Sequence, residues 1–208
     1  CLNAFETSDI IDEIILVVGE SEIDTVREKV VEQYGFHKVS GIVSGGKERY
    51  DSVANGLHYI EDRGLFFDAQ KYVFIQDGAR PFVDEEMLQR LYQDVKKYSA
   101  CVAAVPSKDT IKISDAEGFV ADTPDRSHVW NVQTPQVFEY ELIRDAYFSF
   151  ERDMRADSTQ KPPITDDASL CELYTNRKVK LTMGGYQNIK ITTPDDIPVA
   201  EEILRRTL

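Results

Sequence analysis

The sequence has few cysteines and no long apolar run, and both scarcities exclude classes of protein. Its 208 residues include three cysteines, Cys1, Cys101 and Cys171, which lie far apart. An odd, scattered set fits neither a disulfide framework nor a zinc site, so we expect a reducing cytoplasm. No apolar run approaches the roughly 18 residues of a membrane-spanning helix. The first residues also lack the basic and apolar pattern of a secretory leader.

Basic residues are scarce as well. The chain has 24 Lys and Arg against 37 Asp and Glu, a formal net charge of −13. This balance argues against a nucleic-acid surface, which needs clustered cations. Much of the acid falls on presumed helix faces, for example at residues 84–86 and 201–202. If such a protein binds phosphates, its few cations must be concentrated in the site, so the Lys and Arg inside unusual runs are informative.

The rest of the composition is that of a folded domain. Hydrophobic residues make up 42% of the chain, enough for a core, and the length suits a single domain over residues 1–208. Strands are predicted over residues 12–18, 39–43, 72–75, 100–105 and 179–183, and helices over 22–34, 48–61, 87–95, 139–150 and 165–174. Polar residues 155–163 predict a loop. The alternation predicts an α/β fold with a mostly parallel sheet covered by helices on both faces.

The alternation of predicted strands and helices is interrupted between residues 106 and 136. Apolar and polar residues alternate on either side of residues 116–118, a turn that ends in Gly118. This is the pattern of a β-hairpin. A hairpin inserted in a parallel sheet cannot bury both of its faces on its own core, so we expect it to project and to pack against a second subunit.

Near the C-terminus, residues 188–196 read as a strand that runs into a helix. Thr193 is the expected cap, Pro194 the first helical residue and Asp196 the capping-box acid. Lys190 is the only charge between Ile189 and Thr193. A strand lysine with apolar neighbours needs an anionic partner, and at such a junction it can reach the crevice where phosphorylated ligands bind. The alternative is a side chain that extends to solvent from an edge strand.

The run 77–81 follows the predicted strand 72–75. A carboxylate such as Asp77, at the carboxyl end of a parallel strand, lies on the ligand side of the sheet and could hold a divalent cation. Gly78 would let the chain pass close to a ligand, and Arg80 supplies a planar cation. The structural alternative is an Asx-turn with Arg80 as its ion-pair partner; we favour the functional interpretation.

Two glycines, Gly45 and Gly46, separate a predicted strand from a predicted helix. Free amides at a helix start favour anions, and glycines admit a ligand close to the backbone. Alone, this pattern is more often an ordinary connection between a strand and a helix. Arg49 and Ser52, on the first helical turns, strengthen the functional interpretation.

Other polar residues carry weaker signals. Thr110, Lys112 and Arg126 lie on the predicted hairpin, where charges usually form a solvated face. Thr165 is the expected cap of the helix that follows, and the acids after it favour the positive helix N-terminus more readily than a metal. We find no Ser-His-Asp or Cys-His arrangement for covalent catalysis.

Taken together and in order, these runs resemble the 2-C-methyl-D-erythritol 4-phosphate cytidylyltransferase family, over essentially the whole chain. The matching runs are Gly45-Gly46 with Arg49, Asp51 and Ser52; residues 77–82; residues 108–112; Asp125-Arg126; Trp130; residues 133–138; residues 165–169; and residues 188–196. Their agreement in order and spacing makes the resemblance specific.

The resemblance implies a fold of the nucleotide-diphosphosugar transferase type, a three-layer α/β sheet, with a β-arm over residues 107–136 that embraces a partner in a homodimer. It implies a reaction in which CTP and methylerythritol phosphate are joined, with Mg²⁺ assistance and release of pyrophosphate. The residues that would line the CTP site are Gly46, Arg49, Ser52, Asp77, Gly78 and Arg80, with Asp77 holding the metal. Those that would hold the acceptor phosphate are Lys190 and, from the other subunit's arm, Thr110 and Arg126, with Arg126 and Lys190 acting in catalysis.

The family begins with a strand and a glycine-rich loop that precede the residues present here, so the resemblance implies a nucleotidyltransferase domain lacking that loop. Residues 1–5 match the tail of the helix that follows it. Two alternatives stay open: the related ribitol 5-phosphate cytidylyltransferases, and a non-catalytic dimeric nucleotide-binding protein if the loop is truly missing.

Overall fold

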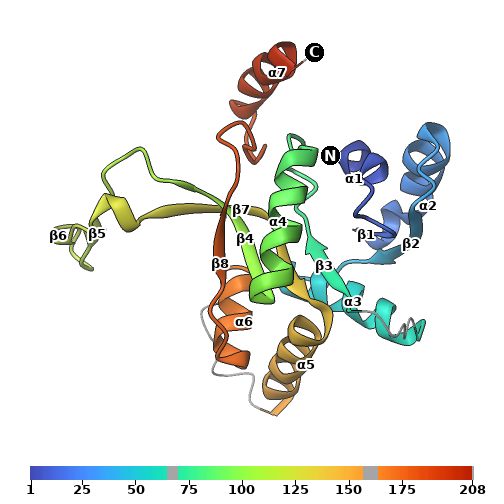
Figure 1. Ribbon diagram of the computed structural model, residues 1–208, viewed down its shortest axis with the longest axis horizontal. Helices are drawn as coiled ribbons and strands as arrows, with labels where there is room; N and C mark the ends of the chain where they lie inside the picture. Colours follow the sequence, from blue (N-terminus) through green and yellow to red (C-terminus); the bar gives the residue numbers. More distant parts are fainter. Residues whose placement is uncertain (65–69, 157–163, 208) are drawn as a thin grey trace.

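The computed structural model describes residues 1–64, 70–156 and 164–207, and it alternates strands with helices over most of that length. The strands are β1 (Ile14–Val18), β2 (Val39–Ser44), β3 (Tyr72–Ile75), β4 (Ala100–Pro106), β5 (Ile113–Ser114), β6 (Val120–Asp122), β7 (Trp130–Glu139) and β8 (Lys180–Met183). The helices are α1 (Leu2–Thr7), α2 (Ile23–Val26) with its continuation η2 (Arg27–Glu32), α3 (Arg49–Asp62), α4 (Glu85–Tyr98), α5 (Tyr140–Ala156), α6 (Asp167–Thr175) and α7 (Asp196–Thr207). The α/β prediction is confirmed (Figure 1).

The sheets are mixed rather than mostly parallel. The central sheet has the order β3-β7-β4-β8, in which β7 is antiparallel to both neighbours and β4 is parallel to β8. β1 and β2 form a separate parallel pair. The prediction was wrong about the central sheet because it missed β7. Parallel neighbours need a long crossover, usually a helix. Here the chain leaves β4, makes a hairpin and returns beside β4 in the opposite direction.

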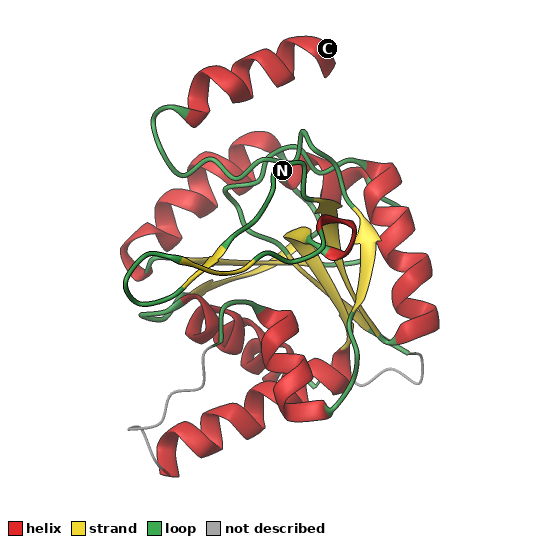
Figure 2. Cartoon of the chain, turned by 90° about the vertical axis from the view of Figure 1, so that its left-hand side faces the viewer, coloured by secondary structure: helices red, strands yellow, loops and turns green. Residues whose placement is uncertain are grey.

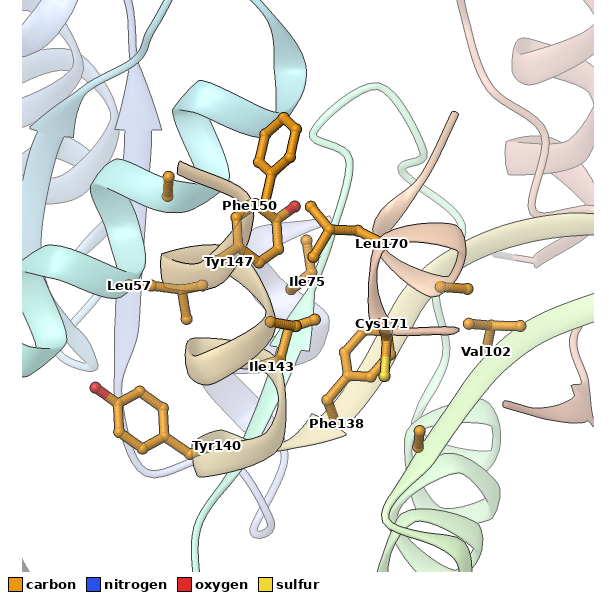
Figure 3. Close-up of a cluster of buried hydrophobic side chains, with 14 residues drawn as sticks. Leu57, Ile75, Val102, Phe138, Tyr140, Ile143, Tyr147, Phe150, Leu170 and Cys171 are labelled. Carbon is orange, nitrogen blue, oxygen red and sulfur yellow. The ribbon is translucent and has the colours of Figure 1, made fainter. Parts of the chain in front are cut away.

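Helices cover both faces of the central sheet, as predicted (Figure 2). The side chains of β4 alternate between the faces. Ala100 and Val102 pack in a cluster with residues of α3, α5 and α6 (Figure 3). Cys101 and Ala103 pack in a second cluster with α4 and Phe5 of α1. The sheet is therefore buried on both sides, which explains the unbroken apolar run of β4.

α4 shows how closely local pattern and structure agree. Its buried side chains, Met87, Leu88, Leu91 and Val95, recur at helical spacing within the predicted helix 87–95. No helix in the described residues is apolar over a length that would span a bilayer.

β5 and β6 pair as an antiparallel hairpin of their own, apart from the central sheet (Figure 1). The turn between them includes Gly118, whose φ of 88° lies in the left-handed region that suits glycine. Apolar side chains of this hairpin are exposed, among them Phe119 at 68% and Val120 at 61%. The hairpin itself is confirmed, whereas its part in a dimer stays a prediction.

The arm is also shorter than the predicted 107–136. Trp130 pairs with Pro106 and Gln136 pairs with Val102, so residues 130–136 belong to the central sheet. β7 continues as a strand through this segment, so the alternation of apolar and polar residues continues as well. The alternation therefore does not mark the residue at which the strand enters the core.

Residues 189–193 do not form the predicted strand. The N–H of Ile191 donates to the carbonyl of Ala79 in the loop after β3. The N–H groups of Thr192 and Thr193 both donate to Asp196 Oδ2, at 2.8 Å. These amides are therefore committed to a loop and to a side chain rather than to a neighbouring strand, and α7 begins at Asp196.

Smaller boundaries also differ. Asp166, not Thr165, caps α6, since its Oδ1 accepts from the N–H of Ser169 at 2.9 Å. α5 continues to Ala156, beyond the expected end at residue 150. The predicted loop 155–163 therefore begins within this helix, and its residues 157–163 lie outside the described part of the chain.

Candidate active site

Asp77 lies in the loop that follows β3, the strand at one edge of the central sheet. Its N–H donates to Thr134 Oγ1 on the neighbouring β7 at 3.1 Å. The loop is closed by Gln76, whose side-chain amide donates to the carbonyls of Asp77 and Arg80, both at 3.0 Å. The loop backbone and β7 therefore hold the Asp77 carboxylate in one place.

Two cations from distant segments meet at this carboxylate. Arg49 Nε lies 3.0 Å from Asp77 Oδ1, and Lys190 Nζ lies 2.8 Å from Asp77 Oδ2. The Asp77 side chain is only 14% exposed. Lys190 thus has the anionic partner that its sequence context predicted, even though its segment is not a strand.

Arg49, the first residue of α3, is held by a second carboxylate. Its Nη1 donates to Asp167 Oδ1 at 2.9 Å and its Nη2 donates to Asp167 Oδ2 at 2.7 Å. Asp167, the first residue of α6, is fully buried. The Tyr147 hydroxyl on α5 also donates to Asp167 Oδ1, at 2.5 Å. Arg49 is therefore hydrogen-bonded both to α6 and to the loop after β3.

This arrangement fixes the charge state of the cluster. Burial alone would raise the pKa of Asp77, but hydrogen bonds from Lys190 and Arg49 outweigh it and lower that pKa. Burial alone would lower the pKa of Arg49, but its bonds to Asp167 and Asp77 raise it overall. Asp77 is thus ionised and Arg49 is charged at neutral pH.

Arg80 is a cation of a different kind. Its Nη1 donates to the carbonyl of Asn188 at 2.8 Å, while its Nε is buried without a hydrogen-bond partner among the described residues. Burial lowers its pKa, although attraction to Asp77 opposes the shift. An arginine with an unused buried donor beside such a cluster is suited to an anionic ligand.

The other residues predicted for the CTP site are Gly46 and Ser52, at the start of α3, and Gly78, in the loop after β3. The N–H of Gly46 donates to Ser52 Oγ at 3.0 Å, which closes the turn before α3. A Cβ on Gly46 would lie 2.1 Å from that of Asp51, so this glycine is required by packing. A Cβ on Gly78 would meet nothing within 4 Å, so the backbone there is open to a ligand.

The two hairpin residues are not brought to this cluster within one chain. Arg126 is exposed in a short 3₁₀ helix, η3 (Arg126–His128), and its Nη1 donates weakly to the carbonyl of Lys108 at 3.4 Å. Thr110 is exposed on the segment that leads to β5. Among the described residues, no hydrogen bond or ion pair joins either side chain to Asp77, Arg49 or Lys190.

Sequence reasoning missed Tyr147 and the role of Asp167. It treated Asp167 as one of two acids suited to a helix N-terminus, which describes Asp166 correctly. Arg49 itself could have indicated that an acid such as Asp167 pairs with it, because a partly buried arginine near a strand end needs a buried acid. The two buried cysteines are poor nucleophiles, since burial raises the pKa of the Cys101 thiol to about 12 and also raises that of Cys171.

The comparison with known families decides the relationship. The family model described as IspD, 2-C-methyl-D-erythritol 4-phosphate cytidylyltransferase, matches residues 1–206. The chain belongs to this family. Relatives with the same description are 44% identical over 204 residues in Lachnoclostridium phytofermentans and 46% identical over 205 residues in Alkaliphilus oremlandii. The alignments cover 98% of this chain in both cases, and 82% and 80% of the relatives.

Solved structures of the family have the same fold. A 4-diphosphocytidyl-2C-methyl-D-erythritol synthase from Anaerococcus prevotii superposes with a TM-score of 0.82 at 33% identity, covering 99% of this chain and 84% of that one. The cytidylyltransferase from Thermus thermophilus superposes with a TM-score of 0.72 at 25% identity, covering 98% and 86%. The three-layer fold implied by the resemblance is therefore confirmed.

Proposed function

We propose that this member of the IspD family transfers CMP from CTP to 2-C-methyl-D-erythritol 4-phosphate. The products are 4-diphosphocytidyl-2-C-methylerythritol and pyrophosphate, a step of the non-mevalonate isoprenoid pathway. The observation that carries the proposal is the convergence of Arg49, Arg80 and Lys190 around Asp77. The three free thiols support a reducing cytoplasm as the location.

The chemistry requires such a set of cations. The attacking phosphate oxygen and the α-phosphate of CTP are both negatively charged, so catalysis must hold two anions in line and neutralise charge on the leaving pyrophosphate. No covalent nucleophile is needed. In this proposal Gly46, Arg49, Ser52, Asp77, Gly78 and Arg80 line the CTP site, and Lys190 holds the acceptor phosphate.

The residues present fit a magnesium ion whose ligands would come partly from the protein and partly from the substrate phosphates. Among the described residues, no three His, Cys, Asp or Glu side chains group as a metal site. Magnesium is commonly bound by one or two carboxylates together with substrate phosphates, and Asp77 supplies one such carboxylate. Bound there, Mg²⁺ would neutralise charge on the phosphates. Asp77 in turn holds Arg49 and Lys190 in position around it.

We also propose that the site is completed by a second copy of the chain. The exposed hairpin carries Thr110 and Arg126 near its base and apolar side chains such as Phe119 near its tip. An exposed apolar hairpin favours packing against a partner. In a homodimer, Thr110 and Arg126 from one arm would then complete the acceptor site of the other subunit.

The experiment is a coupled pyrophosphate-release assay on the purified full-length protein. With CTP and Mg²⁺ we expect turnover of methylerythritol phosphate, loss of turnover after chelation with EDTA, and recovery with excess Mg²⁺. Ribitol 5-phosphate serves as the matched rival acceptor. A higher kcat/KM for ribitol 5-phosphate would assign the chain to the rival activity, and nucleotide binding without turnover of either acceptor would indicate a non-catalytic protein.

A further inference from the structure

Arg49 bonds to two carboxylates, and the division of its donors between them is unequal. Both terminal nitrogens face Asp167, at 2.9 and 2.7 Å, while only Nε reaches Asp77, at 3.0 Å. Paired bonds of this fork geometry fix the plane and the direction of a guanidinium. Asp167 therefore sets the orientation of Arg49. In that orientation, the Nε–H of Arg49 is the donor that points at Asp77.

Asp167 is itself held in place. Its side chain is fully buried, so it has no water to solvate an alternative position. The Tyr147 hydroxyl donates to its Oδ1, and Tyr147 is only 1% exposed, packed among Phe150, Leu170 and other residues of the core cluster (Figure 3). A buried carboxylate needs this full set of partners, since each missing bond leaves an uncompensated charge.

The geometry points to a positioning role: we propose that Asp167, held by Tyr147, aims Arg49 so that one oxygen of Asp77 is left for Lys190. The two ion pairs of Asp77 use different oxygens, Oδ1 for Arg49 and Oδ2 for Lys190. Without the buried carboxylate, the terminal nitrogens of Arg49 would turn toward the nearest remaining anion, which is Asp77. They would then compete with Lys190. This inference rests on the proposed function only in treating Arg49 and Lys190 as substrate-binding groups.

The decisive variant is Tyr147→Phe, because it removes one hydroxyl and retains the ring in the core. Tyr140→Phe is the matched control. Tyr140 lies on the same helix and is 3% exposed, but its hydroxyl donates to Glu61, outside the site. Losing a hydrogen bond to a charged group should cost about tenfold in the affinity that depends on it. We expect Tyr147→Phe to raise the KM for CTP by about three- to tenfold, with kcat changed less, and Tyr140→Phe to leave both unchanged.

A second readout does not depend on turnover. The Nε–H signal of Arg49 in an ¹H–¹⁵N NMR spectrum, assigned by its loss in Arg49→Lys, should shift and exchange faster with solvent in Tyr147→Phe but not in Tyr140→Phe. An unchanged Arg49 signal in folded Tyr147→Phe would overturn the positioning role. If the wild-type protein does not turn over CTP, the proposed function fails, and this signal still decides the role of Tyr147.

Asp167→Asn tests the carboxylate directly. It should raise the KM for both substrates, CTP through Arg49 and the acceptor through Lys190, and Asp167→Glu should restore part of the loss. The effects of Asp167→Asn and Arg49→Lys on the KM for CTP should not add, since the first acts through the second. Additive effects, or a loss confined to kcat in both variants, would contradict the role.

Discussion

At the scale of single residues, the site is organised by one carboxylate and its cations. Asp77 has an ion pair on each oxygen, and both partners come from segments far away in the sequence. Arg49 and Lys190 thereby neutralise Asp77, while Asp167 offsets Arg49. Among the described residues, no carboxylate accepts a hydrogen bond from Arg80, which therefore adds positive charge at the cluster. An acidic chain can thus present a local cationic surface to phosphates.

Lys190 carries the first prediction. Because its charge would hold the acceptor phosphate while the two anions react, Lys190→Ala should lower kcat/KM for methylerythritol phosphate by about two orders of magnitude. The KM for CTP should change much less. Steady-state kinetics with each substrate varied in turn measures both effects.

Lys29→Ala is the matched control for Lys190→Ala, since Lys29 is exposed on η2, outside the cluster. It should leave kinetics unchanged. Near-normal acceptor kinetics in Lys190→Ala would show that Lys190 only neutralises Asp77.

At the scale of elements, local sequence signals set most helices, whereas their ends depend on side chains. α4 illustrates both points. Its apolar stripe predicts the helix, and Asp84 begins it by accepting the N–H of Met87 at 2.7 Å. At the other end, Ser99 has a φ of 66° and stops the helix without a glycine. Side-chain caps are local interactions, so their energetic contribution can be tested one residue at a time.

The Asp84 cap gives a stability prediction. Asp84→Ala should lower the free energy of unfolding by about 1 kcal/mol, because one N–H at the start of α4 loses its partner. Activity at 25 °C should be retained, since α4 supplies no predicted site residue. Urea unfolding followed by circular dichroism measures the change.

Glu85→Ala is the control for this cap. Glu85 lies in the same first turn, but among the described residues its side chain accepts a single, exposed hydrogen bond, from the Gln89 side chain. We expect it to cost a few tenths of a kcal/mol, from the helix dipole. Equal losses in the two variants would show that charge, rather than capping, stabilises this end.

At the scale of the whole molecule, the proposal is that the hairpin of one subunit completes the acceptor site of the other. In the part of the chain that the structure describes, no hydrogen bond or ion pair joins the Asp77 cluster to the hairpin residues Thr110 and Arg126. The proposed dimer places Asp77 of one subunit with Arg126 of the other. This arrangement can be tested because it makes opposite predictions for two heterodimers of identical composition.

In the first heterodimer, one subunit carries Arg126→Ala and the other carries Asp77→Ala. If sites are shared, one site is intact and about half of the wild-type activity per dimer should return. In the second, one subunit carries both substitutions and the other is wild type. Both of its sites are then damaged and it should be inactive. Co-expression with two affinity tags isolates each species for assay.

Sites contained within single chains would give the reverse result. The wild-type subunit of the second heterodimer would then be active, and the first heterodimer would not. This outcome would reject the shared site and assign Arg126 to the site of its own chain.

The sequence by itself determined the local elements and the family. Continuous apolar strands, helical stripes and Gly35, whose φ is 67° after the second helical segment, all reflect interactions between near neighbours. Runs such as 77–81 and 188–196 also placed Asp77, Arg80 and Lys190 among the candidates. These signals can be read from the chain because backbone sterics and side-chain periodicity act over a few residues.

Only the tertiary structure decided the direction of β7, the end of the arm and the partners of Arg49. β7 has the composition of a strand in either direction, and its place between β3 and β4 follows from how the chain returns from the hairpin. Arg49 and Asp167 are separated by 118 positions, and Tyr147 joins them from a third helix. Such contacts arise where a buried charge must find its partners once the core has closed, and no short-range pattern records which residues those are.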